Sequence, residues 1–140
     1  MNDLYLIAHV AGRTVAIESA SVESVVDIGP VTPVPRAADT VRGLATLRSR
    51  VVTVIDTQAA LGIEPDGDMA RRAIVTQVEG HHYAFLVDTL DDVAPFAVQP
   101  LAGAVVLEGA WARAGRGLIE RDGEPVLVID LACLLPVAAE

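Results

Sequence analysis

An internal repeat limits the fold of this chain more than any other feature of its sequence. Residues 43–62 read GLATLRSRVVTVIDTQAALG, and residues 117–135 read GLIERDGEPVLVIDLACLL. The earlier parts match at a shift of 68 residues, where Val10, Gly12, Ala16 and Val25 recur at 78, 80, 84 and 93. The later parts match at a shift of 74 residues, with identical residues at Gly43, Leu44, Val52, Val54, Ile55, Asp56 and Leu61. The chain therefore contains two copies of one unit, and the second copy carries extra residues around 102–115.

The composition favours strands over long helices. The chain is 52% hydrophobic but only 4% aromatic, so its core consists mainly of Val, Leu, Ile and Ala, divided by Gly and Pro. A single copy of about 65 residues is marginal for an independent core. Small antiparallel sheets protect their edges best by closing. We therefore expect an all-β protein made of two similar small barrels that pack on each other.

Turn residues divide the chain into expected elements. Hairpins are predicted over 4–19, 44–56, 73–90 and within 110–130, with turns at 11–13, 48–49, 79–80 and 122–123. Residues 21–28 are expected to form a strand or sheet edge, and residues 29–43, with three prolines, a loop. Short helices or turns are predicted at 57–62 and 131–140. The polar stretch near 63–72 is expected to connect the two halves.

Charge and cysteine content exclude several functions. The net charge of −9 makes nonspecific nucleic-acid binding unfavourable. All ten basic residues are arginine, and four of them lie between 36 and 55, where Asp39 is the single acid. This distribution predicts a basic patch, although ordinary surface variation explains it equally well. Cys133 is alone, so the chain has neither an internal disulfide nor a cysteine-based metal site.

The N-terminal segment MNDLYLIAHVAG does not have the character of a signal peptide. It carries an acid where a signal peptide has positive charge, and its apolar run is too short to span a bilayer. We therefore expect a cytoplasmic protein without direct membrane insertion.

Asp56 and Asp130 are the acids that the repeat singles out. Each follows an apolar strand and precedes a short run of small residues. This is the position of a helix N-cap, where a carboxylate accepts free backbone N–H groups and contributes about 1 kcal/mol. The alternative is a pair of catalytic carboxylates. Because equivalent positions would lie in different barrels, we favour capping.

Other candidate chemistry is sparse. His81 and His82 are adjacent in an expected strand, so they point to opposite faces and are poorly placed to bind one metal. His9 has no acid or cysteine at ligand spacing, and a solvent-facing turn is the expected place for these histidines. The acids of residues 88–92 lack the ligand pattern of a calcium loop. We find no nucleophile or phosphate-binding motif, and we expect no cofactor. A binding module is therefore favoured over an enzyme.

The chain resembles the CheW family of bacterial chemotaxis adaptors over nearly its whole length. The strongest part is VTPVPRAADTVRGLATLRSRVVTVID (31–56), which is similar to the family's V-P step and G-x-x-x-L-R-G-x-V-x-P-V-x-D-L run. AIESASVESV (16–25), YAFLVDTLDDV (83–93) and VLVIDLACLL (126–135) resemble further family segments. The resemblance implies one domain over 1–140, built from two pseudo-symmetric five-stranded SH3-like barrels with termini free to cross between them.

The resemblance also implies a function without catalysis. CheW-like proteins link the cytoplasmic tips of chemoreceptors to the regulatory domain of a CheA-type histidine kinase. By position, Val22 and Arg48 fall at partner contacts, and Val87 falls on a strand that lines the receptor groove between the barrels. We expect Arg48 to reach carboxylates or carbonyls from a hairpin tip. Leu44, Leu47 and Val51 are expected to form an apolar centre around it.

Departures from the family pattern leave alternatives open. The glycine of L-R-G is Ser49, the glutamate of V-x-E-I is Ser24, and Thr53 and Thr57 replace a proline and a leucine. One alternative is therefore a divergent module that serves another pathway. The other is a small-ligand sensor or enzyme, in which a cleft between the barrels uses Asp56, Asp88 or Asp130 as an acid group.

Overall fold

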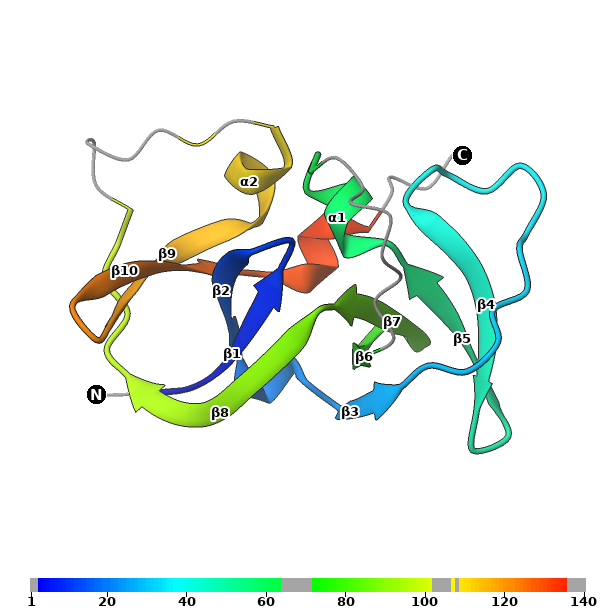
Figure 1. Ribbon diagram of the computed structural model, residues 1–140, viewed down its shortest axis with the longest axis horizontal. Coiled ribbons are helices and arrows are strands. Elements are labelled where there is room, and N and C mark those ends of the chain that lie inside the picture. Colours follow the sequence, from blue (N-terminus) through cyan, green and yellow to red (C-terminus); the bar gives the residue numbers. More distant parts are fainter. Residues whose placement is uncertain (1–2, 64–71, 102–106, 108, 136–140) are drawn as a thin grey trace.

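The chain forms two five-stranded sheets (Figure 1). The structure is a computed structural model that describes residues 3–63, 72–101, 107 and 109–135. The terminal sheet, which contains the first and last strands, has the order β8-β1-β2-β10-β9. The central sheet has the order β3-β6-β7-β5-β4. The predicted all-β class, with five strands in each unit, is confirmed.

The bounds of the strands follow the predicted hairpins closely. The terminal sheet consists of β1 (Asp3–Val10), β2 (Arg13–Glu18), β8 (Thr89–Phe96), β9 (Gly115–Arg121) and β10 (Glu124–Ile129). The central sheet consists of β3 (Ser24–Asp27), β4 (Val41–Leu47), β5 (Arg50–Ile55), β6 (Arg72–Val78) and β7 (His81–Val87). Most of the predicted connector near 63–72 lies outside the described residues.

Helices are short and lie at the ends of strands. They are α1 (Thr57–Ala60), α2 (Gly109–Ala114) and the 3₁₀ helices η1 (Ser19–Ser21) and η2 (Leu131–Leu134). Of these, α1 and η2 were predicted, whereas α2 lies in a segment for which the sequence predicted no helix. Within the described part of the chain, no helix is long and apolar enough to cross a bilayer.

Four tight turns close the predicted hairpins with the same backbone conformation. Both central residues have positive φ at Ala11–Gly12, Arg48–Ser49, Glu79–Gly80 and Asp122–Gly123. Turns of this kind match the twist of the flanking strands and favour glycine at the second position. Three of the four have that glycine, and only the β4–β5 turn has Ser49 in its place.

Each sheet takes strands from both copies of the repeat. The first copy supplies β1 and β2 to the terminal sheet and β3, β4 and β5 to the central sheet. The second copy supplies β6 and β7 to the central sheet and β8, β9 and β10 to the terminal sheet. Two equivalent parallel pairings join the copies, with Val128 opposite Ala16 and Val54 opposite Ala84. The copies have therefore exchanged their first hairpins.

Strands buried on both faces explain the long apolar runs. Each sheet curls around a core of its own, and a third core lies between the sheets. Along β1, Tyr5 and Ile7 face the core of the terminal sheet, whereas Leu6 and Ala8 face the third core. From the central sheet, Phe85 joins that third core, which we call the shared core. Removing apolar area from water on both faces is the main stabilising term of such strands.

Because Gly43 and Gly117 have no side chain, a neighbouring segment can lie against the edge strand at each position. Leu44 exchanges two backbone hydrogen bonds with Thr32, of 2.8 and 2.9 Å, and Leu118 exchanges two with Gln99. A Cβ atom on Gly43 would collide with the carbonyl oxygen of Thr32, and one on Gly117 would lie 2.7 Å from that of Gln99. These equivalent contacts cover the outer edges of β4 and β9 near Leu44 and Leu118.

Asp56 and Asp130 are N-caps, as predicted. Asp56 Oδ1 accepts a hydrogen bond of 3.1 Å from the N–H of Ala59, and Asp130 Oδ1 accepts one of 3.0 Å from that of Ala132. The second oxygen of Asp56 lies 3.1 Å from Arg42 Nε. Arg116 makes the equivalent contact with Asp130, at 3.6 Å. Each carboxylate therefore satisfies the start of a short helix and holds an arginine of the same copy.

Replacing Gly43 by alanine is expected to lower the free energy of unfolding by at least about 3 kcal/mol, because the new Cβ must displace the Thr32 segment. Gly12→Ala is the matched control, since Gly12 also has positive φ but has open space around its Cβ position. That variant should lose only about 1 kcal/mol. Urea denaturation compares the two, and equal losses would show that the Thr32 segment moves aside freely.

Asp56→Ala is expected to lower the free energy of unfolding by about 1–2 kcal/mol through loss of the cap. Asp56→Asn should lose less, because asparagine caps a helix as well as aspartate does. Thermal and urea unfolding of both variants measure the difference. Wild-type stability in Asp56→Ala would contradict the capping role.

Candidate protein-binding surfaces

The β4–β5 hairpin carries four of the six predicted binding residues. Val51 is 61% exposed and Leu44 is 38% exposed, and both lie on the outer face of the central sheet. Leu47 lies on the other face, where it packs against the core of the central sheet. The apolar surface near Arg48 therefore consists of Leu44 and Val51 on one face, with Leu47 on the opposite face.

Arg48 projects from the tip of this hairpin. It has φ of 49° and is followed by Ser49 with φ of 67°. Among the described residues, Arg48 has no ion pair or side-chain hydrogen bond, whereas Arg42, Arg50 and Arg72 each have an acidic partner. The guanidinium of Arg48 is therefore available to an outside carboxylate or carbonyl.

A pocket of about 170 Å³ opens beside the hairpin. We call it the hairpin pocket; its lining residues include Leu47, Arg48, Arg50, Glu23 and His82. Glu23 Oε2 lies 3.3 Å from His82 Nε2, and Glu23 Oε1 lies 3.8 Å from Arg50 Nη1. Ser24 also lines the pocket, and Glu23, the residue before it, supplies an acid there. The expectation of a solvent-facing turn was wrong for His82 and for His9. His82 lies in β7 with only 14% of its side chain exposed, and His9 lies in β1 with 28% exposed.

Val22 and Val87 lie near the junction of the sheets. Val22 packs against the shared core and lines a cleft of about 360 Å³, together with the end of β6 and the start of η2. Val87 is 1% exposed within the shared core. A partner therefore has access to the cleft beside Val22, whereas Val87 supports the junction from inside.

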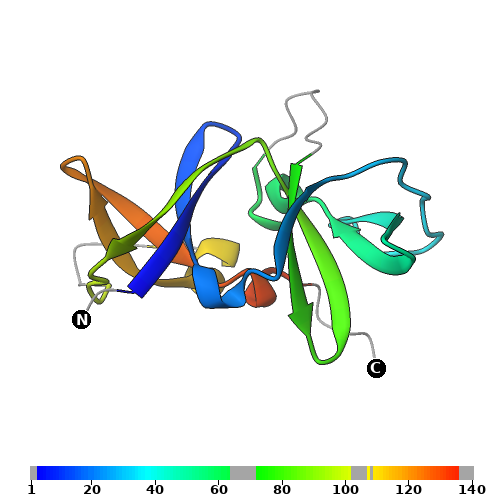
Figure 2. The same ribbon diagram turned by 90° about the horizontal axis from the view of Figure 1, so that it is seen from below.

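Three exposed aliphatic side chains that the sequence did not single out lie on sheet faces that also carry residues of the shared core. Leu4, Val25 and Val93 are exposed. Leu4 and Val93 share a face of the terminal sheet with the shared-core residue Leu6, and Val25 lies opposite Ile74 of the same core on the central sheet. In Figure 2, β1 and β8 lie at the left and β3 lies to their right, near the middle of the molecule. We call these three residues the inter-sheet strip.

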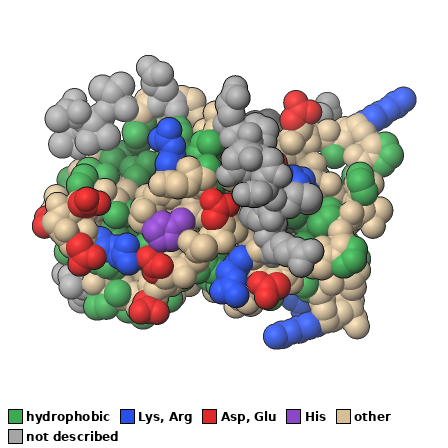
Figure 3. Space-filling view, in the orientation of Figure 1, with side chains coloured by type: hydrophobic (Ala, Val, Ile, Leu, Met, Phe, Trp, Pro, Cys, Tyr) green, Lys and Arg blue, Asp and Glu red, His purple; other side chains and the backbone are tan. Residues whose placement is uncertain are grey.

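The two sheets differ in the charged side chains that they expose. In Figure 3 acidic side chains gather over the terminal sheet, and arginines project from the central sheet. The acids of the terminal strands and their turns include Glu18, Asp91, Asp92, Glu120, Asp122 and Glu124. The predicted basic patch of residues 36–50 lies on the central sheet and the loop before it.

Asp88 and Asp91, two of the acids of residues 88–92, also have partners in the structure. Asp91 Oδ2 lies 3.0 Å from His9 Nε2 and 2.7 Å from Arg121 Nη2. The hydrogen bond with His9, and the charge of Arg121, hold the pKa of Asp91 below its usual range. Asp88 accepts a hydrogen bond of 2.7 Å from the N–H of Ala11. The described residues contain no group of three or more His, Cys, Asp or Glu that could hold a metal ion.

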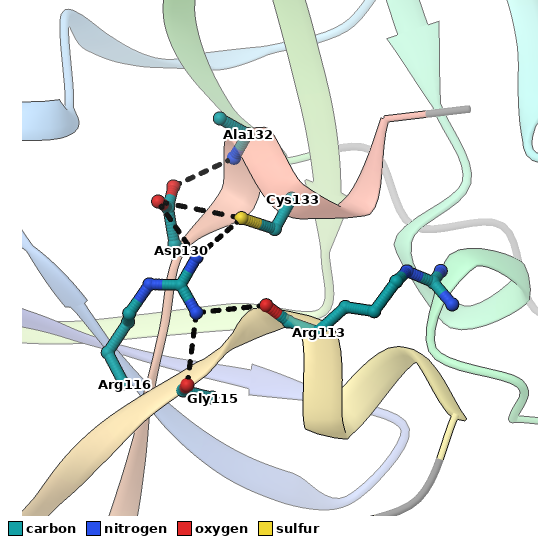
Figure 4. A network of polar contacts seen from close by, with 6 residues as sticks. All are labelled: Arg113, Gly115, Arg116, Asp130, Ala132 and Cys133. Atoms are coloured by element: carbon teal, nitrogen blue, oxygen red, sulfur yellow. Dashed lines mark hydrogen bonds and ion pairs between the residues drawn. The ribbon is translucent and has the colours of Figure 1, made fainter. Parts of the chain in front are cut away.

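Asp130 belongs to a local polar network (Figure 4). Arg116 donates to the carbonyl oxygens of Arg113 and Gly115, at 2.9 and 3.1 Å, and its Nη2 lies 2.6 Å from Cys133 Sγ. Cys133 also lies 3.7 Å from Asp130 Oδ2. These contacts join α2, β9 and η2 and account for both oxygens of Asp130.

Comparison with known proteins gives consistent matches. Residues 4–139 match the profile of the CheW-like domain. Chemotaxis protein CheW of Thermotoga maritima is 26% identical over 119 residues, which cover 85% of this chain and 78% of that protein. Chemotaxis protein CheW of Rhizobium meliloti is 27% identical over 109 residues, which cover 76% of this chain and 70% of that protein.

The fold is similar to that of a solved structure, the scaffolding protein TtCheW from Thermoanaerobacter tengcongensis. The TM-score is 0.85 at 21% sequence identity, and the match covers 98% of this chain and 94% of that one. The family profile and the fold thus cover the same, nearly complete, length of the sequence. The chain belongs to the CheW-like domain family.

Proposed function

We propose that this protein is a non-enzymatic coupling protein of a chemotaxis pathway, which links the cytoplasmic tips of chemoreceptors to the regulatory domain of a CheA-type histidine kinase. The observation that carries the proposal is the presence of two separate sets of exposed aliphatic side chains on sheets that share one core. They lie on the hairpin surface of Leu44, Arg48 and Val51, and in the inter-sheet strip. Family membership supports the same function.

The hairpin surface is the proposed site for the kinase. An exposed arginine beside exposed aliphatic side chains is a common composition for the centre of an interface. Arg48 offers a planar fork of donors to carboxylates or carbonyls of the partner. Leu44 and Val51 supply apolar area that the partner would remove from water.

The inter-sheet strip is the proposed site for the receptor tip. A helix with one apolar face can lay that face into an apolar groove, with contacts spaced three or four residues apart. Leu4, Val25 and Val93 supply exposed apolar area on both sheets, on faces that also carry shared-core residues. We place the protein in the cytoplasm, where its partners would recruit it to membrane receptor arrays.

Structural roles account for the acids that a small-ligand enzyme would use. Asp56 and Asp130 are engaged as caps, and Asp88 binds the β1–β2 turn. An adaptor needs none of these groups for chemistry.

Arg48→Glu is expected to weaken binding to the regulatory domain of the CheA-type kinase by at least tenfold, because a favourable charged contact becomes a repulsive one. Isothermal titration calorimetry measures the affinity, and circular dichroism checks the fold. Arg36→Glu is the matched control, since Arg36 is also exposed, has positive φ and carries the same charge. Its loop lies at the other end of β4 in Figure 1. Equal losses in the two variants would show a general charge effect in place of a site at Arg48.

Val93→Asp is expected to abolish binding to receptor tips while leaving the affinity for the kinase domain unchanged. The charge would be placed in the apolar strip and would have to be desolvated beneath a docked helix. Co-sedimentation with receptor-containing membranes measures the loss. Val98→Asp, at an exposed valine outside the strip, serves as control. Unimpaired sedimentation of Val93→Asp would place the receptor site elsewhere.

A further inference from the structure

One nitrogen atom in the hairpin pocket contacts two groups that require it to be in opposite protonation states. His82 Nε2 lies 2.8 Å from Arg50 Nη1 and 3.3 Å from Glu23 Oε2. The three residues come from β7, from β5 and from the segment before β3. The His82 side chain is largely buried, whereas those of Arg50 and Glu23 are 57% and 40% exposed.

The chemistry of these groups allows only one of the two contacts at a time to be a hydrogen bond. A guanidinium only donates, so the 2.8 Å contact requires His82 Nε2 to carry a lone pair and no proton. A carboxylate only accepts, so a hydrogen bond to Glu23 requires a proton on the same nitrogen. Imidazole is the side chain that ordinarily changes charge between pH 5 and 8. A proton on Nε2 therefore exchanges the hydrogen-bond partner of that atom from Arg50 to Glu23.

We propose that His82 is a proton-controlled positioning residue of the hairpin surface. Unprotonated, it accepts from Arg50 and holds that side chain in the hairpin pocket. Protonated, it donates to Glu23 and no longer accepts from Arg50, which keeps only its longer 3.8 Å contact with Glu23 and turns toward Arg48 on the surface that faces the partner. This regulation rests on the proposed function of the hairpin as the kinase site.

The charges around His82 determine the direction of the effect. Glu23, Arg48 and Arg50 are the charged residues that line the hairpin pocket with it. Its other lining residues are uncharged, as is Gln77, which lies opposite His82 on β6. Protonation therefore adds one positive charge beside two arginines. A partner that offers carboxylates to this surface binds more tightly in the protonated state.

The decisive comparison is the affinity for the kinase regulatory domain at pH 6 and pH 8. We expect the wild type to bind about threefold more tightly at pH 6, the size of one exposed charge contact. His82→Gln should show a flat profile, because its amide oxygen can accept from Arg50 while its amide nitrogen donates to Glu23 at either pH. His81→Gln is the matched control. His81 is exposed on the neighbouring position of β7 and should leave the wild-type profile unchanged.

Equal pH profiles in the wild type, His82→Gln and His81→Gln would overturn the proposal, because the titrating group would then belong to the partner. A readout without any partner separates this outcome from failure of the proposed function. In ¹⁵N spectra of the free protein at pH 8, His82 should carry its proton on Nδ1. A proton on Nε2 at that pH overturns the proposal. If His82 shows the expected tautomer but the protein does not bind the kinase domain at any pH, the exchange at His82 is supported and the proposed function is contradicted.

Discussion

The exchange of hairpins between the two copies is the constraint on which the rest of the structure depends. Because β1 and β2 complete the terminal sheet while β6 and β7 complete the central sheet, neither sheet contains a full set of strands from one copy. Leu6 and Phe85 contribute to the shared core from opposite sheets. The shared core therefore forms together with the two sheets. The hairpin surface and the inter-sheet strip are consequently held at a fixed separation and orientation. The proposed coupling function needs this property, because two partners would have to be presented to each other in one geometry.

Comparison of the two copies separates residues that hold the fold from residues that are free to bind. Gly43 and Gly117 have the same role at an edge strand, and the Arg42–Asp56 pair has its counterpart in Arg116 and Asp130. These features recur because both sheets need them. The turns differ: Arg48–Ser49 in the first copy stands where Asp122–Gly123 stands in the second. The sign of the charge is reversed at the tip while the backbone conformation is kept, so the copies agree in architecture and differ in the charge that their turns expose.

Local signals in the sequence predicted the hairpins, their turns and the two caps, because each depends on a few adjacent residues. They could not predict which hairpin pairs with which, since pairing is a long-range property and both copies present similar strands. The burial of Val87 escaped prediction for a related reason: strands buried on both faces lose the alternation that marks an exposed side. The partners of His9 and His82 are 82 and 59 residues distant, at Asp91 and Glu23, so no spacing rule would find them.

The β4–β5 turn keeps a conformation that its residues do not favour. Both Arg48 and Ser49 have positive φ, and a serine costs about 1 kcal/mol relative to glycine in that region. Arg48 forms no ion pair or side-chain hydrogen bond with the described residues that would offset this conformational cost. The conformation is instead imposed by the β4–β5 ladder, in which Leu47 pairs with Arg50 and Leu47 packs against the core of the central sheet. Strain of this kind persists where surrounding packing over-determines the backbone, and it is concentrated at functional sites. The ladder and the core beneath it thus fix the backbone of Arg48, whose side chain has no ion pair or hydrogen bond among the described residues. A fixed backbone at an exposed arginine lowers the ordering cost of the contact proposed for it.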